Sequence, residues 1–252
     1  MNYKKSSHIL VMVPTYNEID NIDIFVKRLI SVRSSPMSGK FDVLFIDDNS
    51  PDGTGNELDL YSQQYDFISV IHRQKKAGIG TAHRVGISEA YNRGYTHLVT
   101  MDADFTHPPE FIPLLLEKSG LYDVVIGGRH AKKESLAGWS AWRKLLTFAD
   151  HQFTLHWLYL PYDATSAFRI YRIDSIPHGI FTMAGSTGYS FFFEVLCLMN
   201  ENDISIYDVP VILPPRSAGH SKLRFADMVN WVLTALSLGY RIRIHDKSLY
   251  IK

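Results

Sequence analysis

Several features that would point to particular classes of protein are missing from this sequence. It has a single cysteine, Cys197, which excludes an internal disulfide and a multi-cysteine metal site and agrees with a reducing compartment. Lysine plus arginine equals aspartate plus glutamate, 26 of each, so no overall charge favours nucleic acid. The H-E-x-x-H, Walker A and G-x-S-x-G patterns are absent, which argues against zinc hydrolysis, P-loop chemistry and hydrolase triads.

Long hydrophobic runs are also missing. The apolar run before Pro14 is too short for a signal peptide, and no segment reaches the roughly 20 apolar residues that span a bilayer. Residues 228–240 come nearest. We therefore expect a cytoplasmic protein with Cys197 in its core. Its hydrophobic content of 46% over 252 residues suffices for one α/β domain with an appendage.

Short β-branched runs alternate with helical patterns in the first half of the chain. The runs occupy residues 8–13, 41–46, 67–71, 97–101 and 123–128. This alternation predicts a Rossmann-like, mostly parallel sheet with helices on both faces. After residue 130 the pattern loosens, with a strand at 167–173, a helix at 190–200, a strand pair around 204–213 and a last helix at about 222–240.

Helix-start signals support these boundaries. Thr54-Gly55-Asn56-Glu57 matches a capping box. Pro108 and Pro109 stand where a first helical turn tolerates proline.

Three of the predicted strands end in acidic turns, "PTYNE" (14–18), "DDNSPDG" (47–53) and "DAD" (102–104). Ligands of open parallel sheets bind outside the carboxyl ends of the strands, so these turns should converge. Gathered carboxylates are costly unless a cation or the donors of a ligand compensate them. Asp102 and Asp104, two positions apart, therefore predict a Mg²⁺ site, and the alternative is that they only satisfy turn and helix-end amides.

Two other patterns are weaker. Residues 48–59 imitate a Ca²⁺-binding loop, but a strand precedes them and Pro51 interrupts them. "KKAGIGTAHRVG" has His83 in place of the third glycine of a dinucleotide fingerprint and follows a third strand, so a nicotinamide cofactor is unsupported. We expect Gly78 and Gly80 to let a loop approach a nucleotide closely.

Seven motifs, taken together, resemble those of family 2 glycosyltransferases, and most closely those of dolichol-phosphate mannosyltransferases and their bacterial polyprenyl-phosphate relatives. They are "VMVPTYNEIDNI", "DDNSPDGTG", "KAGIGTAHRVGI", "MDADFTHPPEFIP", "VVIGGRH", "DATSAFRIYR" and "RSAGHSKLR". The resemblance spans residues 8 to about 240. It implies a GT-A fold, a nucleotide-diphosphate sugar donor carrying GDP or UDP, inversion at the sugar, and a Mg²⁺ or Mn²⁺ ion that bridges the diphosphate.

The resemblance also implies site residues. Asp102 and Asp104 would hold the metal, with Thr106 as a third candidate where many relatives carry glutamine, and Ala167 stands where glycine is common. The residues expected at the nucleotide sugar are Pro14, Thr15, Tyr16, Glu18, Asp47, Asp48, Gly78, Gly80, Asp102, Ala103, Arg169, Arg216 and Lys222.

Breaking the bond between sugar and phosphate leaves a negative diphosphate, so catalysis needs cations in addition to the metal. Arg129, Arg169, Arg216 and Lys222 are the candidates, although each would also suit a solvated surface. A phosphate acceptor needs no general base because its second pKa is about 6. A hydroxyl acceptor would need one, for which Asp163 and Glu194 are candidates that would equally suit pairing with arginines.

The hypothesis from the sequence is hexose transfer, of mannose or glucose type, to a polyprenyl phosphate. The last helix is apolar between Arg224 and a basic end at Arg241, Arg243 and Lys247, which suits either a membrane interface or packing as core. Trp139, Trp142 and Trp157 mark a second, weaker candidate contact with the membrane. We expect peripheral binding at the cytoplasmic face of a membrane, where a membrane partner subunit is an option.

The expected organisation is a catalytic domain at 1–215, with a nucleotide-sugar half at about 1–120 and an acceptor half at about 121–215. Residues 216–252 would form a phosphate-contacting loop and the last helix. Three alternatives stay open: a glycan or cell-wall hydroxyl acceptor, a nucleotidyltransferase, and a non-catalytic nucleotide-sugar binding module.

Overall fold

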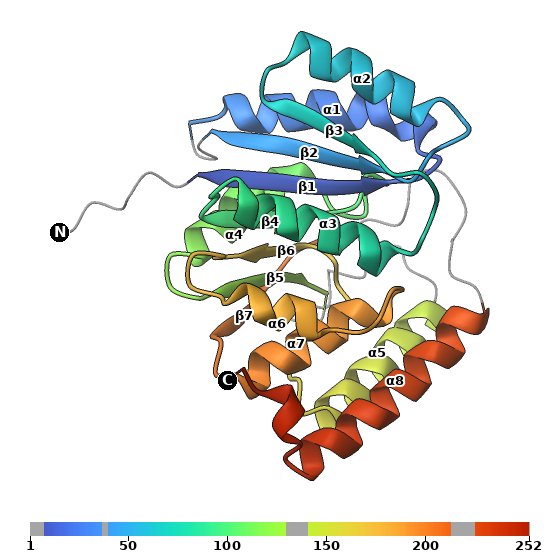
Figure 1. The fold of residues 1–252 in the computed structure, drawn as a ribbon, viewed down its shortest axis with the longest axis vertical. Coiled ribbons are helices and arrows are strands. Elements are labelled where there is room, and N and C mark those ends of the chain that lie inside the picture. Colours follow the sequence, from blue (N-terminus) through green and yellow to red (C-terminus); the bar gives the residue numbers. More distant parts are fainter. Residues whose placement is uncertain (1–7, 37–39, 130–140, 213–224, 252) are drawn as a thin grey trace, which may run out of the picture.

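The computed structural model describes residues 8–36, 40–129, 141–212 and 225–251 (Figure 1). Its centre is a seven-stranded sheet in the order β3-β2-β1-β4-β6-β5-β7. β6 runs antiparallel to β4 and β5, and the other pairs are parallel. The predicted mostly parallel α/β sheet is therefore confirmed.

The strands and helices have the following bounds. The strands are β1 (Ile9–Thr15), β2 (Phe41–Asp47), β3 (Ile68–His72), β4 (His97–Thr100), β5 (Val124–Gly128), β6 (Arg169–Tyr171) and β7 (Ile206–Pro210). The helices are α1 (Ile19–Ser34), α2 (Thr54–Gln64), α3 (Ile79–Asn92), η1 (Pro109–Phe111), α4 (Ile112–Lys118), α5 (Ala141–Trp157), α6 (His178–Met183), α7 (Ser190–Glu201), α8 (Phe225–Arg243) and η3 (Lys247–Leu249).

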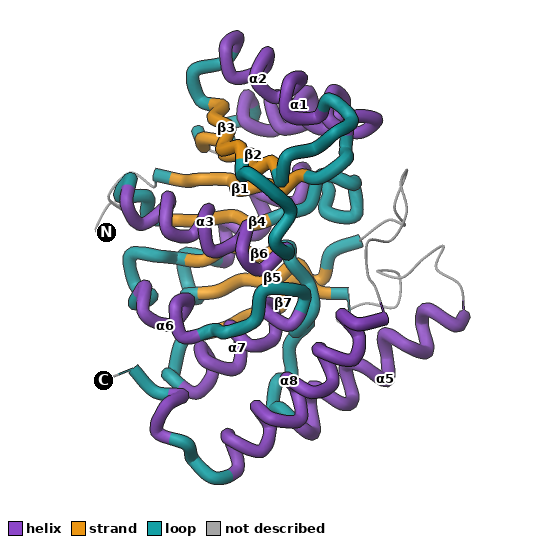
Figure 2. Tube along the Cα trace, turned by 45° about the vertical axis from the view of Figure 1, so that its right-hand side comes forward, coloured by secondary structure: helices purple, strands orange, loops and turns teal. Residues whose placement is uncertain are grey.

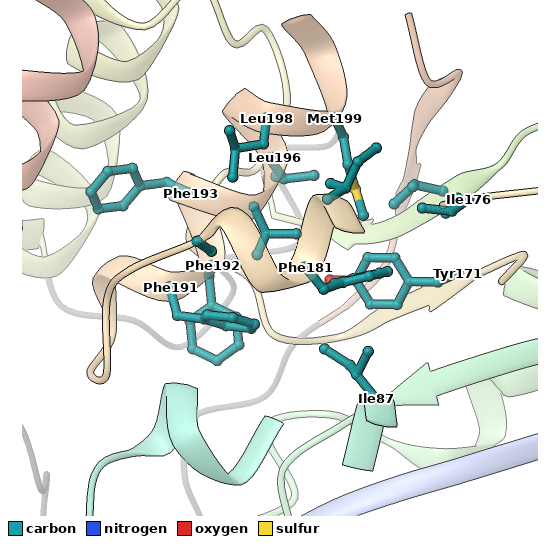
Figure 3. Packing of buried hydrophobic residues seen from close by; sticks show 14 of the residues in the cluster. Ile87, Tyr171, Ile176, Phe181, Phe191, Phe192, Phe193, Leu196, Leu198 and Met199 are labelled. Carbon is teal, nitrogen blue, oxygen red and sulfur yellow. The ribbon is translucent and has the colours of Figure 1, made fainter. Parts of the chain in front are cut away.

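Helices cover both faces of the sheet because successive strand residues point to opposite faces. In β1, Leu10 and Met12 belong to the core shared with α3, α6 and α7, whereas Val11 and Val13 belong to the core under α1, α2 and α4. Figure 3 shows the first of these cores where α7 meets α6. Burial on both faces explains why the strands read as continuous apolar runs.

Three expectations about individual elements need correction. Thr54 does not cap α2: Gly53 occupies the cap position at φ 95°, and the Thr54 hydroxyl donates to Asp52 Oδ1. The expected strand pair around 204–213 is, over its described residues, the single strand β7, which pairs with β5. The region after residue 130 also contains α5, a helix that the sequence pattern does not predict.

The α5–α8 pair lies at one end of the molecule, where α8 also packs on α7 (Figures 1 and 2). Gly239 lets the two helices approach closely, since a Cβ there would lie 2.2 Å from Trp157 Nε1. Trp157 Nε1 donates to the Ala235 carbonyl at 3.0 Å, and the Arg243 guanidinium lies 4.0 Å from the centre of the Trp157 ring. These contacts join the carboxyl-terminal ends of both helices.

The two sides of α8 differ in exposure. One side packs as core, which was one of the two expectations, and contact of the other side with a membrane stays a prediction. Ala235, Leu238 and Ile242 are buried against the rest of the protein. Both α5 and α8 also carry exposed apolar side chains. We call this set the α5–α8 apolar face, and it consists of Leu145, Phe148, Met228, Val229, Val232, Leu233, Leu236 and Tyr240. Among the described helices, none has the length and apolar character needed to cross a membrane.

Candidate active site at the carboxyl ends of the strands

The acidic turns meet at one edge of the sheet, as predicted. β2 and β4 flank β1 in parallel, so all three strands release their turns on the same side. The first two turns are joined directly: Asn17 N donates to Ser50 Oγ at 3.0 Å, and Glu18 N donates to Thr54 Oγ1 at 2.9 Å. The third turn leaves beside them, since Met101 N donates to the Met12 carbonyl on β1 at 3.2 Å.

Each of these turns contains, or is followed directly by, a non-glycine residue in the left-handed region. They are Asn17 at φ 53°, Asn49 at φ 57° and Phe105 at φ 63°. Such conformations cost on the order of 1–3 kcal/mol each and persist where the surroundings hold them, often at functional sites. The edge of the sheet therefore presents turns that are fixed before any ligand binds.

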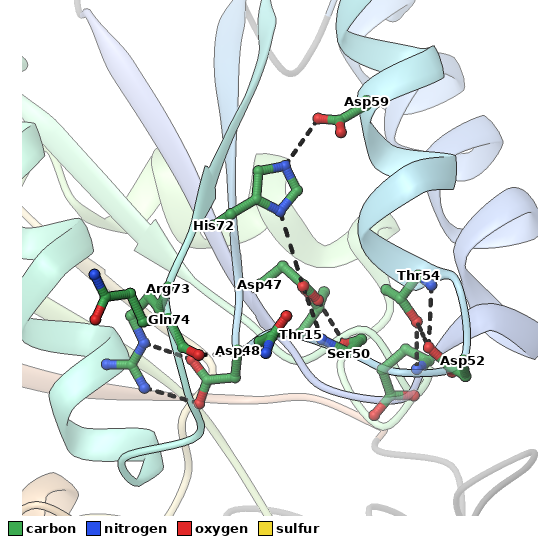
Figure 4. Close-up of polar contacts among 12 residues, drawn as sticks. Thr15, Asp47, Asp48, Ser50, Asp52, Thr54, Asp59, His72, Arg73 and Gln74 are labelled. Atoms are coloured by element: carbon green, nitrogen blue, oxygen red, sulfur yellow. Dashed lines mark hydrogen bonds and ion pairs between the residues drawn. The ribbon is translucent and has the colours of Figure 1, made fainter.

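Asp47 supports the second turn from inside (Figure 4). Its Oδ1 accepts from the hydroxyls of Thr15 (3.2 Å) and Ser50 (2.5 Å), and its Oδ2 accepts from Ser50 N (3.0 Å). Asp47 and Thr15 are 2% and 3% exposed. Their side chains support the turn that carries Asp48, and their direct contact with a nucleotide stays a prediction.

Asp48 is held by an arginine that the sequence analysis missed. Arg73 Nε and Nη2 donate to the two carboxylate oxygens of Asp48, the latter at 2.8 Å, and Arg73 Nη1 donates to Thr81 Oγ1 at 2.7 Å (Figure 4). The available signal was its position, one residue after β3 on the same edge. Nearby, Lys76 Nζ lies 4.1 Å from the centre of the Tyr16 ring. Donor contacts by Pro14, Tyr16, Glu18 and Asp48 stay predictions.

The third turn holds its two aspartates differently. The side chain of Asp102 is 35% exposed, whereas Asp104 is 3% exposed and its Oδ1 accepts from Thr106 N (3.1 Å) and Thr106 Oγ1 (2.5 Å). The turn-satisfying role considered for these aspartates is thus present at Asp104. Thr106 binds Asp104 through its hydroxyl, and the intervening Ala103 is 2% exposed.

The donor set fits a cation that a ligand shares. Across the residues described by the structure, no three His, Cys, Asp or Glu side chains form a closed metal site. Mg²⁺ commonly uses one or two carboxylates and takes its other ligands from water and substrate phosphates. Asp102 and Asp104 supply the number of carboxylates that such a site uses, and their role as metal ligands stays a prediction.

The two glycines at the start of α3, Gly78 and Gly80, allow a close approach to another segment of the protein. Their expected approach to the nucleotide stays a prediction. A Cβ on Gly78 would lie 2.4 Å from the Thr187 carbonyl oxygen, and one on Gly80 would lie 2.8 Å from Phe191 Cβ. Gly80 N also donates to Thr187 O at 2.8 Å. The segment of residues 184–188 is thereby held against the start of α3, on the edge that carries the acidic turns.

Glu194 fastens the other side of the same segment. Its Oε1 and Oε2 accept from Gly185 N (2.9 Å) and Ser186 N (2.8 Å). The role of general base considered for Glu194 is corrected, because both oxygens bind backbone amides. The alternative expectation was that Glu194 pairs with arginines, and its observed partners are these backbone amides instead.

The Asp163 carboxylate also binds within the protein. Its partner is an arginine, which was the alternative to a role as general base. Arg129 Nη2 donates to Asp163 Oδ1 at 2.6 Å and Arg129 Nε to Oδ2 at 2.8 Å. The Asp163 side chain is fully buried, and Ser166 N also donates to it at 3.2 Å. Both carboxylate oxygens of Asp163 thus bind donors within the protein, which argues against the role of general base. Asp163 orients Arg129, whose side chain is 17% exposed.

Two further acids, not identified from the sequence, surround this pair. Burial raises the pKa of Asp150 to about 6, an effect that the Arg129 charge opposes. Burial and the neighbouring Asp163 carboxylate raise the pKa of Asp208 to about 7. Asp208 Oδ2 accepts from Asp163 N at 2.8 Å. No local spacing in the sequence indicates this cluster, which forms because β7 lies beside β5 and because Asp150 comes from α5.

Arg169 lies inside the protein. It is fully buried and donates to the carbonyls of Phe192 (2.9 Å) and Ala164 (2.8 Å). Its expected contact with the donor is corrected, because it links the start of α7 to the segment before β6. Arg216 and Lys222 lie outside the described residues, as do Trp139 and the side chain of Trp142.

Comparison with known proteins agrees with this geometry. Residues 10–183 match the model of the family described as glycosyl transferase family 2. The chain belongs to this family. It is a glycosyltransferase with the GT-A fold.

The curated relatives of this glycosyltransferase match along nearly their full length. It is 33% identical to an undecaprenyl-phosphate mannosyltransferase from Micrococcus luteus over 94% of this chain and 98% of the relative. It is 31% identical to a polyprenol monophosphomannose synthase from Mycolicibacterium smegmatis, over 96% and 90%.

The fold is shared with solved structures. Glucosyl-3-phosphoglycerate synthase from Mycobacterium tuberculosis, in complex with Mn²⁺, UDP-glucose and phosphoglyceric acid, superposes with a TM-score of 0.64 at 18% identity. The match covers 93% of this chain and 80% of that one. At this identity the similarity shows the fold alone.

Proposed function

We propose that this glycosyltransferase moves a hexose, of mannose or glucose type, from a nucleotide-diphosphate sugar to a polyprenyl phosphate. The observation that carries the proposal is the meeting of three acidic turns at one sheet edge, with the Asp102–Asp104 pair beside the turn of Asp48. The names of the two curated relatives support this acceptor class.

The protein groups have distinct tasks in this proposal. Asp102 and Asp104 would hold Mg²⁺ or Mn²⁺, which supplies positive charge where the diphosphate leaving group becomes negative. Asp48, fixed by Arg73, and the neighbouring Tyr16 and Glu18 bind the nucleoside. Arg129, whose Nε and Nη2 bind Asp163, would contribute the positive charge of its guanidinium toward a phosphate.

The hydrogen bonds of the candidate bases favour a phosphate acceptor. Asp163 and Glu194 each use both carboxylate oxygens within the protein. A phosphate monoester is largely dianionic at neutral pH and attacks without losing a proton. An acceptor of this kind requires neither carboxylate as a base.

The α5–α8 apolar face supports binding at a membrane surface, where a polyprenyl chain is dissolved. Leu233 on this face is 60% exposed and Met228 is 53% exposed. Arg241 and Arg243 follow at the end of α8. An apolar helix face with basic residues at its end suits the interface of an anionic membrane, so we propose peripheral binding at a cytoplasmic membrane face.

A glycan or cell-wall hydroxyl is the second candidate acceptor. It would need a general base, for which Asp208 is the candidate: its Oδ1 is buried with no hydrogen-bond partner among the described residues, and burial raises its pKa to about 7.

An acceptor assay separates the candidates. The enzyme is incubated with Mn²⁺ and radiolabelled GDP-mannose or UDP-glucose, together with vesicles containing either polyprenyl phosphate or the matching polyprenol, or with a soluble glycan. A separate reaction supplies a nucleoside triphosphate in place of the sugar donor. We expect lipid-soluble label with polyprenyl phosphate alone. Label only on polyprenol or a glycan would contradict the acceptor, and pyrophosphate release from a nucleoside triphosphate would indicate a nucleotidyltransferase.

A further inference from the structure

His107 lies directly behind the turn that carries the two aspartates. The residue is 6% exposed, and its ring stacks on Phe168, with centroids 5.3 Å apart and an interplanar angle of 18°. Its Nδ1 lies 2.9 Å from the backbone nitrogen of Asp102 and 3.5 Å from Asp102 Oδ2. One imidazole nitrogen thus faces both the backbone and the carboxylate of the same aspartate.

The backbone contact assigns the state of the ring. A peptide N–H can only donate, so Nδ1 accepts from Asp102 N and the proton of the neutral ring sits on Nε2. The lone pair of Nδ1 is then directed to the N–H, and the ring offers no Nδ1–H to Asp102 Oδ2. His107 therefore fixes the position of Asp102 through its backbone.

The turn between Asp102 and His107 depends on a hydrogen bond of this kind. Phe105 sits at φ 63°, a costly conformation for a bulky residue, and it reverses the chain so that His107 returns to Asp102. The Asp104–Thr106 bonds hold the middle of the turn. The stack on Phe168 anchors the ring to the residue before β6, in the half of the chain assigned to the acceptor.

We propose that His107 is a positioning residue for the metal–diphosphate site. By accepting the Asp102 N–H, it keeps the Asp102 and Asp104 carboxylates where a divalent cation and the donor diphosphate meet. The proposal rests on the proposed function, because it assumes that these two aspartates bind the cation.

Two substitutions separate the acceptor atom from the ring. His107→Phe keeps an aromatic ring on Phe168 but removes the acceptor. His107→Asn removes the ring but places an amide Oδ1 where Nδ1 was, so it can accept the same N–H. His83→Phe is the matched control. His83 is another buried histidine whose ring packs against a phenylalanine, with the ring centroids of His83 and Phe192 4.8 Å apart. Its Nε2 has no hydrogen-bond partner among the described residues.

The measurement is Mn²⁺ binding by electron paramagnetic resonance of free Mn²⁺, with GDP or UDP at saturation, alongside thermal unfolding without ligand. We expect His107→Phe to bind Mn²⁺ about tenfold or more weakly, in the range seen when partners of metal ligands are removed. His107→Asn should recover most of that affinity, and His83→Phe should match the wild type. The kcat/KM for sugar transfer should follow the Mn²⁺ affinity.

The outcomes are distinct. Wild-type Mn²⁺ affinity in His107→Phe, or a loss in a folded His107→Asn as large as that in His107→Phe, overturns the positioning role and leaves the proposed function standing. If His107→Phe does not fold, His107→Asn decides alone, since weak Mn²⁺ binding by it contradicts the proposal and near-normal binding supports it. A wild-type enzyme that binds no Mn²⁺ with either diphosphate refutes the metal-dependent function and this inference together.

Discussion

The carboxylates near the sheet edge differ in how their oxygens are used. That difference distinguishes residues that hold the structure from those that could act in the reaction. Asp47, Asp163 and Glu194 give both oxygens to donors of the protein, so they fix turns, an arginine and a loop. Asp102 keeps about a third of its side chain exposed at the end of β4. It is the acid whose loss should affect chemistry with the least effect on folding.

Asp102→Asn should reduce sugar transfer by about 10²–10³-fold, because it removes charge that holds the ion opposing the leaving diphosphate. It should also remove the extra thermal stabilisation that Mn²⁺ adds to a bound nucleoside diphosphate, a shift set by ligand affinity. Asp66→Asn, at an exposed position in the turn before β3, is the control. An unchanged Mn²⁺-dependent shift in Asp102→Asn would remove this residue from the metal site.

Asp208 should make the stability of the protein depend on pH. Its pKa rises from 3.8 to about 7 on folding, mainly through burial. Between these values the folded chain keeps a proton that the unfolded chain releases, so the free energy of unfolding falls as pH rises from about 4 to about 7. Asp208→Asn should remove this fall, raising the free energy of unfolding relative to wild type at pH 8 by on the order of 4 kcal/mol.

The measurement is urea unfolding of both proteins at pH 4.5 and pH 8. Asparagine can still accept from Asp163 N through its side-chain oxygen, so the local hydrogen bond is retained. A difference in unfolding free energy that is the same at both pH values would show that Asp208 keeps an ordinary pKa.

The junction between the start of α3 and the segment 184–188 depends on the absence of side chains. Gly78→Ala should lower the free energy of unfolding by about 2 kcal/mol or more, because its Cβ would lie 2.4 Å from a backbone carbonyl oxygen and its φ is 97°. Gly94→Ala is the matched control, because Gly94 also has a positive φ, 69°, but a Cβ there would meet nothing within 4 Å. We expect this variant to lose about 1 kcal/mol of unfolding free energy. Equal losses in urea unfolding would show that the close approach adds nothing.

Helix α8 should contribute membrane affinity through its exposed side. Leu233→Glu replaces a side chain that is 60% exposed on the α5–α8 apolar face, and Leu60→Glu replaces one that is 59% exposed on α2. We expect about tenfold weaker co-sedimentation with anionic phospholipid vesicles for Leu233→Glu, since loss of a buried leucine costs about 1.5 kcal/mol. Leu60→Glu should bind like the wild type, and an equal loss in both variants would argue against a defined face.

Patterns in the chain predicted the parallel sheet well, because strands covered on both faces give continuous apolar runs and their turns must leave at one edge. The meeting of the turns at 14–18, 47–53 and 102–104 followed from that topology. Sequence spacing did not predict partners that come from distant elements. Arg73 binds Asp48 from the end of β3, and Asp208 reaches Asp163 from β7.

The sequence also did not show which polar side chains would be buried. Arg169 looked like a phosphate ligand because arginine commonly is one, yet the position of β6 in the middle of the sheet encloses it. The capping box at Thr54 failed for a related reason. Its hydroxyl is engaged by Asp52 and by the backbone of Glu18, which approaches from the first turn.

The central claim for the complete chain is that its converging turns hold a cation shared with the donor diphosphate. A crystal of the enzyme with Mn²⁺ and a nucleoside diphosphate, with anomalous scattering recorded at the manganese edge, tests it directly. The account predicts one manganese peak bound by the Asp102 and Asp104 carboxylates and by the diphosphate, at about 2.1–2.2 Å as for similar hard cations. A diphosphate bound without manganese at this turn, or manganese bound elsewhere on the chain, would contradict it.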